Sequence, residues 1–194
     1  YELYGQMSAR VMTTLEEMFP RLEVYSIDEA FADLTGLQSD LVELGREARA
    51  RVLLWTGIPV GVGIGPTKTL AKLANWAAKT WRKSEGVIDL RDPSRRDRLL
   101  QMTDVSEVWG VGRRLTARLQ PLGIKTAWDL AQYDPVSLRR QFSVVLEKTA
   151  RELRGISWLQ LEEAVPPRQI IGSSKMFGAR VRELPPIREA VAAY

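Results

Sequence analysis

The run YSIDEAFADLT at residues 25–35 is the most informative stretch of this sequence. Apolar runs at 22–27 and 30–34 lie on either side of Asp28 and Glu29, and this pattern predicts two strands joined in a hairpin. Because successive strand residues point to opposite faces, both carboxylates reach one centre only if the backbone turns there. Half-buried carboxylates need cations beside them, and hard oxygen ligands suit Mg²⁺. A solvated hairpin tip is the alternative explanation for the pair.

Further elements are predicted on both sides of this hairpin. Apolar residues recur at helical spacing before it, and short apolar runs alternate with helical patterns after it. This order predicts the α+β class, with helices on one face of a mainly antiparallel sheet. The predicted helices are 1–18, 38–54 and 67–81, and the predicted strands after the hairpin are 60–64 and 86–90.

A glycine-rich run followed by lysines occupies residues 60–79, VGVGIGPTKTLAKLANWAAK. It matches neither a P-loop nor a dinucleotide fingerprint, although a glycine-rich strand end leading into a helix can bind phosphate through free backbone N–H groups. Lys68 and Lys72 share one face of the predicted helix, and Lys79 lies two turns beyond Lys72. An amphipathic helix with a solvated lysine face is the alternative.

A second glycine motif occupies residues 108–124, VWGVGRRLTARLQPLGI, within a region of short predicted helices. Its spacing predicts a helix–hairpin–helix in which Gly110 and Gly112 form a tight turn with outward N–H groups. Such a turn accepts a DNA phosphate without reading base sequence. Trp109 is predicted to lie in the core rather than to stack on bases, and a purely structural helical hairpin is the alternative. The basic residues that add charge to this element are Arg113, Arg114 and Arg118.

Composition limits the chemistry that the chain can perform. The 28 Lys and Arg residues exceed the 24 Asp and Glu residues, and the resulting net charge of +4 is compatible with a polyanionic partner. Histidine and cysteine are both absent, which excludes Ser-His-Asp triads, thiolate metal sites and histidine-based zinc sites. No apolar run approaches the ~20 residues that a bilayer span needs, and no signal peptide is visible.

Residues 25–35 resemble the palm motif of the Y-family, or translesion, DNA polymerases, and residues 60–79 resemble the glycine–lysine run of that family. The sequence as a whole is most similar to the UmuC type of the family, as at residues 67–75, and the resemblance continues in order through essentially all 194 residues. It implies a ferredoxin-like polymerase palm followed by a small all-helical thumb with a helix–hairpin–helix motif. The expected domains are the palm at 1–91, the thumb at 92–165, and a linker at 166–194 with the start of the little-finger domain, whose first strand is expected at 170–184.

The resemblance also implies a role for each site residue. Asp28 would bridge two Mg²⁺ ions and Glu29 would bind the catalytic one, as two-metal nucleotidyl transfer requires. Lys79 would contact the incoming deoxynucleoside triphosphate, and Lys72 would lie close to the carboxylates and balance their charge. The residues expected to hold the DNA backbone are Gly110, Gly112, Arg113 and Arg114.

The function implied by the resemblance is template-directed DNA synthesis across damaged bases, on a primer–template DNA. A UmuD-like dimer, a recombinase filament and a sliding clamp are the implied protein partners, in a cytoplasmic, nucleoid-associated setting. The family's first metal-binding aspartate, its fingers and most of its little finger have no counterpart in these residues. The chain alone is therefore expected to be inactive, with an incomplete metal cage. A non-catalytic DNA-binding protein and a helix–hairpin–helix nuclease are the alternatives.

Overall fold

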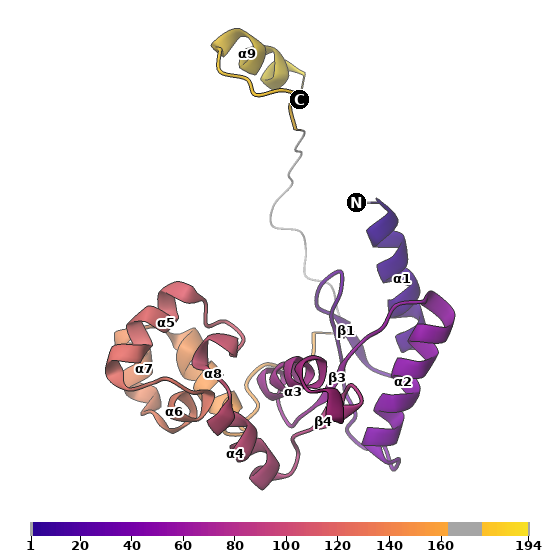
Figure 1. The fold of residues 1–194 in the computed structure, drawn as a ribbon, viewed down its shortest axis with the longest axis vertical. Coiled ribbons are helices and arrows are strands. Elements are labelled where there is room, and N and C mark those ends of the chain that lie inside the picture. The colour runs from indigo at the N-terminus through magenta and orange to yellow at the C-terminus, as the bar shows by residue number, and fades with distance from the viewer. Residues whose placement is uncertain (1, 163–175, 194) are drawn as a thin grey trace. The chain divides into compact units, whose positions relative to one another are not determined.

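The computed structural model describes residues 2–162 and 176–193 (Figure 1). Contacts within the chain divide it into two compact units, Tyr1–Glu163 and Ala164–Tyr194. None of the helices in the described ranges is both long enough and apolar enough to cross a membrane.

The first half of the larger unit contains every helix and strand that its sequence pattern predicts, in the predicted order. Helix α2 begins because Asp40 accepts hydrogen bonds from the N–H groups of Val42 and Glu43, and it ends at Gly57 with φ +74°. The strands are only three residues long, shorter than their apolar runs. The elements are α1 (Glu2–Glu16), β1 (Leu22–Val24), β2 (Ala30–Ala32), α2 (Leu41–Thr56), β3 (Val62–Ile64), α3 (Lys68–Thr80), a 3₁₀ turn at Arg82–Ser84, and β4 (Val87–Asp89).

The strands differ from the prediction in how they pair. Within the described residues they form two separate two-stranded sheets instead of one mainly antiparallel sheet. The hairpin pair β1–β2 is antiparallel, with Glu23 opposite Phe31. The pair β3–β4 is parallel, with Gly63 opposite Ile88. The parallel pair follows from its connection, because the helix α3 returns the chain to the end of the sheet from which it started.

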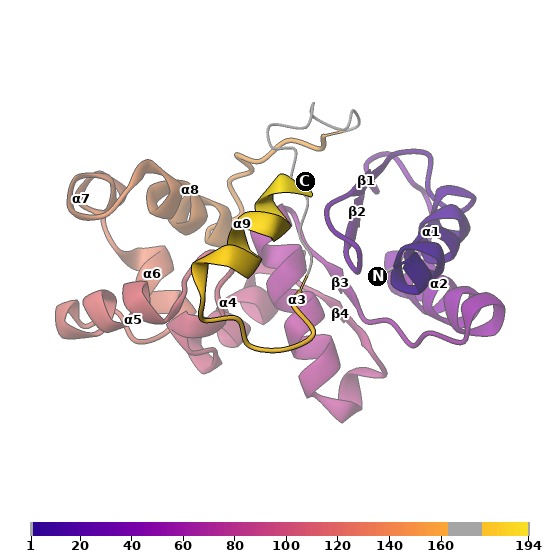
Figure 2. The same ribbon diagram turned by 90° about the horizontal axis from the view of Figure 1, so that it is seen from above.

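The second half of the larger unit is helical, as predicted, and gathers on the opposite side of α3 from α1 and α2 in both views (Figures 1 and 2). One buried core joins it to α3, since Leu70 and Leu73 of α3 pack in the same cluster as Leu119 and Leu153. The core therefore crosses the predicted boundary between residues 91 and 92, and that boundary stays a prediction. The elements are α4 (Pro93–Met102), α5 (Arg113–Leu119), α6 (Ala127–Gln132), α7 (Pro135–Gln141) and α8 (Val144–Leu153), with 3₁₀ turns at Val105–Glu107 and Gln120–Leu122.

Glu152 joins α8 to the beginning of α3, and its carboxylate is fully buried. One oxygen, Oε2, accepts from the Thr69 backbone N–H at 3.0 Å and from the Thr69 hydroxyl at 2.6 Å. The other oxygen, Oε1, accepts from the N–H groups of Trp158 and Leu159. The N–H of Leu70 is taken by the Thr67 hydroxyl. The N–H groups of Thr69 and Leu70 are therefore not available to a phosphate at the start of this helix, because a carboxylate and a hydroxyl of the chain itself accept from them.

We expect Glu152→Ala to lower the free energy of unfolding by about 2–5 kcal/mol, because each buried donor that loses its acceptor costs ~1–3 kcal/mol. The substitution leaves the N–H and hydroxyl donors of Thr69 buried without an acceptor, and it removes the acceptor of the part-buried N–H groups of Trp158 and Leu159. Urea denaturation followed by circular dichroism measures the loss. Glu47→Ala is the matched control, since Glu47 forms an exposed ion pair with Arg51 that is worth at most ~1 kcal/mol. Equal losses in the two variants would contradict the role given to Glu152.

The second unit is described only at residues 176–193. The strand predicted at 170–184 lies partly outside the described residues, and residues 176–183 contain no strand. Helix α9 (Leu184–Ala192) has a proline in its first turn, where the missing N–H of proline costs no helical hydrogen bond.

Candidate active site

The hairpin between β1 and β2 turns tightly at the carboxylate pair. The N–H groups of Tyr25 and Ser26 both donate to the carbonyl oxygen of Glu29, at 3.0 and 3.1 Å. The Ser26 hydroxyl donates to Asp28 Oδ1 at 2.7 Å. Because this turn interrupts the alternation of a strand, Asp28 and Glu29 line the same cavity. Asp28 is exposed and Glu29 is half-buried. Only Asp28 therefore fits the alternative of a solvated hairpin tip.

Lys72 reaches Glu29 from α3. Its ammonium nitrogen lies 3.0 and 2.8 Å from the two carboxylate oxygens of Glu29. Lys68, one turn earlier, forms an ion pair with the buried Glu23 instead. The Lys68 and Lys72 side chains are only 12% and 20% exposed, so the alternative of a solvated lysine face is wrong for both. An ammonium held by both oxygens of Glu29 indicates that this position attracts a cation.

Lys79 is exposed in the last turn of α3 and lines a second cavity, of about 530 Å³. Asp28 lines this cavity as well, together with Gly61 and Asn75. The ammonium of Lys79 on α3 and the carboxylate of Asp28 on the hairpin therefore line the same cavity. Lysine in such a position serves as a point charge for phosphate oxygens.

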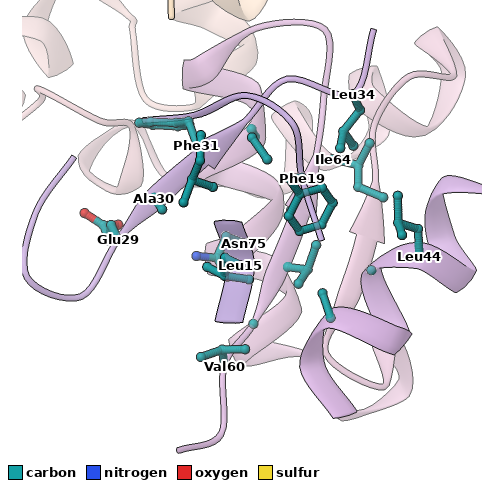
Figure 3. A pocket seen from close by; sticks show the side chains of 18 of the residues that line it. Leu15, Phe19, Glu29, Ala30, Phe31, Leu34, Leu44, Val60, Ile64 and Asn75 are labelled. Carbon is teal, nitrogen blue, oxygen red and sulfur yellow. The ribbon is translucent and has the colours of Figure 1, made fainter. Parts of the chain in front are cut away.

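The cavity that holds Glu29 and Lys72 has a volume of about 180 Å³ and lies between β2 and β3. Figure 3 shows Ala30 and Phe31 on one wall and Leu44 on the opposite one. Its lining is apolar apart from the side chains of Asp28, Glu29, Lys72 and Asn75. In the described part of the chain, Asn75 Oδ1 is the one buried side-chain oxygen or nitrogen without a hydrogen-bond partner.

Free backbone edges also face this cavity. The backbone N–H and C=O groups of Val62 and Ile64 form the hydrogen bonds to β4 and its flanking residues. The backbone groups of Gly61 and Gly63, which alternate with them, therefore point away from β4. In the other sheet, the backbone N–H and C=O groups of Ala30 and Ala32 point away from β1 for the same reason. All four of these edge residues line the cavity, and no described strand pairs with either edge.

The turn predicted at Gly110 and Gly112 is present in the helical region. Gly110 has φ +86°, in the left-handed region, and Gly112 caps the start of α5. No atom lies within 4 Å of a Cβ built on either glycine, so the turn faces open space. Arg113 and Arg114 are exposed beside it. Arg118 instead donates to the Gln141 carbonyl at 2.9 Å.

Trp109 does not lie in the buried core, contrary to the prediction. It is half-buried, and its ring packs edge-on against Tyr25 with the ring centroids 5.3 Å apart. Its centroid also lies 6.0 Å from that of Phe31, in a tilted arrangement. The residue before the glycine turn thus touches the hairpin that carries Asp28 and Glu29.

The carboxylates present fit part of a Mg²⁺ site. Asp28 and Glu29 supply hard oxygen donors, and the ammonium of Lys72 stands where a cation would bind Glu29. Within residues 2–162 and 176–193, no group of three or more potential ligands surrounds a common point. Asp33 is engaged elsewhere, since hydrogen bonds from the hydroxyl and N–H of Thr35, together with Arg21, hold its pKa below the ordinary value despite some burial. Two carboxylates supply only part of a Mg²⁺ coordination shell, which in proteins is commonly completed by water and substrate oxygens.

Three residues can be assigned to the site only from the structure. The sequence offers no signal for Asn75, because an asparagine on a helix gives no sign of which polar atom lacks a partner. The sequence patterns around Tyr25 and Trp109 do not indicate that the two side chains meet. Their contact joins segments more than eighty residues apart. Only the fold brings them together.

The sequence of this chain is similar to those of several known proteins. Residues 1–76 match the impB/mucB/samB family, and residues 93–124 match the helix–hairpin–helix motif of the IMS family. The UmuC protein of Salmonella typhimurium is 56% identical over all of this chain and 47% of its own length. DNA polymerase IV of Pelotomaculum thermopropionicum is 35% identical over 73% of this chain and 35% of its own length.

The chain belongs to the Y-family DNA polymerases. Solved structures of this family share its fold. DinB from Sulfolobus solfataricus superposes with a TM-score of 0.66 and 29% identity, over 84% of this chain and 48% of the other. An insertion ternary complex of Dbh DNA polymerase gives a TM-score of 0.63 and 31% identity, over 78% of this chain and 45% of the other. The chain spans about half the length of UmuC, at 47%, and its match covers 35% of the DNA polymerase IV named above.

Proposed function

We propose that this chain provides the palm and thumb of a polymerase that copies DNA across damaged bases by two-metal nucleotidyl transfer. The observation that supports this most directly is the arrangement around the hairpin. Asp28 and Lys79 face one hollow, while Glu29 is held by Lys72 beside it. A triphosphate that carries its own cation needs carboxylates for the metal and a lysine for the phosphates, and both are present.

In this proposal, Asp28 and Glu29 hold the divalent cations, with Mg²⁺ as the expected metal. Bound there, the cations would activate the primer hydroxyl and stabilise the leaving pyrophosphate. The residues of the chain orient the substrates. Lys79 holds the triphosphate against the hollow, and Lys72 keeps positive charge beside Glu29, which lowers the repulsion between carboxylate and phosphate.

The split sheet fits a palm that lacks one strand. Two free edges, one on β2 and one on β3, face a single apolar cavity. A strand placed between them would have neighbours ~4.8 Å away on each side and would join both sheets into one. Its backbone would also offer a partner to Asn75 Oδ1. A carboxylate on such a strand would lie beside Asp28 and Glu29, in agreement with the incomplete metal cage.

A chimera tests the proposal directly. These 194 residues would replace the matching segment of UmuC from Salmonella typhimurium, which is 56% identical. We expect the chimera to extend a primer past a template lesion in the presence of Mg²⁺, and the 194-residue chain alone to give no extension. A chimera that binds primer–template but does not extend it would favour the non-catalytic DNA-binding alternative. Strand cleavage in place of extension would favour the nuclease.

The glycine turn is expected to bind duplex DNA by its backbone. Gly112→Val should weaken binding of the 194-residue chain to duplex DNA by about tenfold, whatever the base sequence, because the side chain would project where a phosphate approaches. Fluorescence anisotropy with two unrelated duplexes measures it. Gly5→Val is the matched control, since Gly5 also faces open space, on α1. Unchanged affinity in Gly112→Val would remove the turn from the DNA interface.

The remaining parts of the proposal rest on the likeness to UmuC alone. They are a UmuD-like dimer, a recombinase filament and a sliding clamp as partners, and a cytoplasmic location with the nucleoid. Co-purification of the chimera with each candidate partner tests them one at a time.

A further inference from the structure

An aromatic box surrounds the ammonium of Lys72. Its nitrogen lies 4.9 Å from the centroid of the Tyr25 ring and 4.8 Å from that of the Trp109 ring. Both distances are within the ~6 Å at which a cation is attracted to an aromatic face, and the attraction grows when the cation is shielded from water. The side chain of Lys72 is 20% exposed. Lys72 is thus held by two rings as well as by Glu29.

The box brings together three segments that are far apart in the sequence. Tyr25 comes from the hairpin, where its N–H donates to the carbonyl of Glu29. Lys72 comes from α3, and Trp109 comes from the loop before α5. The two rings meet edge-on, with an angle of 88° between their planes, so each limits the movement of the other.

Trp109 is also rigidly placed within its own loop. Val108 before it and Val111 after it are both buried, and the N–H of Val111 donates to the carbonyl of Val108 at 2.9 Å. With these two anchors in the helical core, the ring of Trp109 projects away from that core. Gly110, the first glycine of the turn, follows it directly.

Ordinary packing of the two halves against each other does not require this box. The halves are already joined by the core that includes α3 and by the buried Glu152. Trp109 is only partly buried and does not belong to that core. Its ring lies instead against the ammonium of Lys72, which pairs with Glu29.

We propose that Tyr25 and Trp109 are positioning residues that hold the Lys72 ammonium beside Glu29, and so fix the glycine turn relative to the metal-binding hairpin. This inference rests on the proposed function. A metal ion bound by Glu29 would compete with Lys72 for the carboxylate oxygens, and the two ring faces would then keep the ammonium in place. The positive charge would stay beside the hairpin, where the proposed function places the phosphates, instead of moving into solvent.

The first test uses the 194-residue chain and needs no activity. Protons next to the ammonium of Lys72 should show upfield ring-current shifts by NMR. Trp109→Leu should remove much of the shift, and Trp109→Phe should keep part of it. The matched control is Trp55→Leu, since Trp55 packs on Arg51 at 5.6 Å and belongs to a different helix. Unshifted signals in the unsubstituted chain, or signals that Mg²⁺ moves to solvent-like positions, would overturn the proposal.

The second test uses the UmuC chimera and separates kcat from DNA affinity. Trp109→Leu should lower kcat by about tenfold, the effect of losing one shielded cation–π contact, and leave the Kd for primer–template unchanged. Trp109→Phe should restore most of the rate, and Trp55→Leu should not change it. Weaker DNA binding with an unchanged kcat would assign Trp109 to the DNA and overturn the proposal. An inactive unsubstituted chimera with the expected ring-current shifts would count against the proposed function alone.

Discussion

Gly63→Ala should unfold most of the larger unit under conditions in which the unsubstituted chain is folded. A Cβ at this position would lie 2.1 Å from the Ala71 carbonyl oxygen and 2.2 Å from the Asn75 nitrogen. Both atoms belong to the backbone of α3, which cannot move aside without carrying Leu70 and Ala74 out of the core. We expect a loss of more than ~4 kcal/mol, a large part of the ~5–15 kcal/mol that stabilises a domain.

The measurement is urea denaturation, with circular dichroism as the probe. Gly5→Ala is the matched control, because Gly5 lies within α1 and a Cβ there meets no atom within 4 Å. Alanine is the better helix former, so this control should gain roughly 0.5–1 kcal/mol. A Gly63→Ala chain as stable as the unsubstituted one would mean that α3 does not pack this closely on β3.

Gly63 also marks a limit of what the sequence predicts. The glycine-rich run allows a phosphate site with free N–H groups, and its pattern correctly predicts the strand and the helix around it. The structure assigns the glycines to close packing, with Gly63 and Gly65 pressed against the backbone of α3. The N–H groups at the start of that helix are taken by Thr67 and Glu152. Glycine patterns for close approach and for phosphate binding look alike in a sequence.

Local features were predicted well, and distant contacts were not. The turn at Asp28 and Glu29 follows from apolar runs a few residues away, so the hairpin could be predicted. The ion pair between Lys72 and Glu29 spans 43 residues and followed only from the likeness to a family. The buried Glu152 lies 83 residues from its partner Thr69, and nothing near it in the sequence indicates an acceptor for that helix. The separation of the strands into two sheets also depends on distant pairing.

The carboxylates are expected to have the largest effect on activity. In the UmuC chimera, Asp28→Asn and Glu29→Gln should each lower kcat for primer extension by at least ~10³-fold, equivalent to ~4 kcal/mol of transition-state stabilisation. An amide is a much weaker ligand than a carboxylate for a hard divalent cation, while its size is almost the same. The affinity for primer–template should change little, because duplex binding is assigned to the glycine turn.

Asp33→Asn is the matched control for this loss, since Asp33 follows the same hairpin and is bound by Arg21 and Thr35. Its pKa is lowered, chiefly by the Thr35 hydroxyl, so its ionised form stabilises the fold at neutral pH and that contribution disappears as the pH falls through the lowered pKa. Asp33→Asn should therefore reduce stability slightly and leave kcat within a few-fold. Equal loss of kcat in Asp28→Asn and Asp33→Asn would show that the carboxylates of the hairpin contribute only to the stability of the fold. Extension that survives in Asp28→Asn and Glu29→Gln would place the chemistry elsewhere.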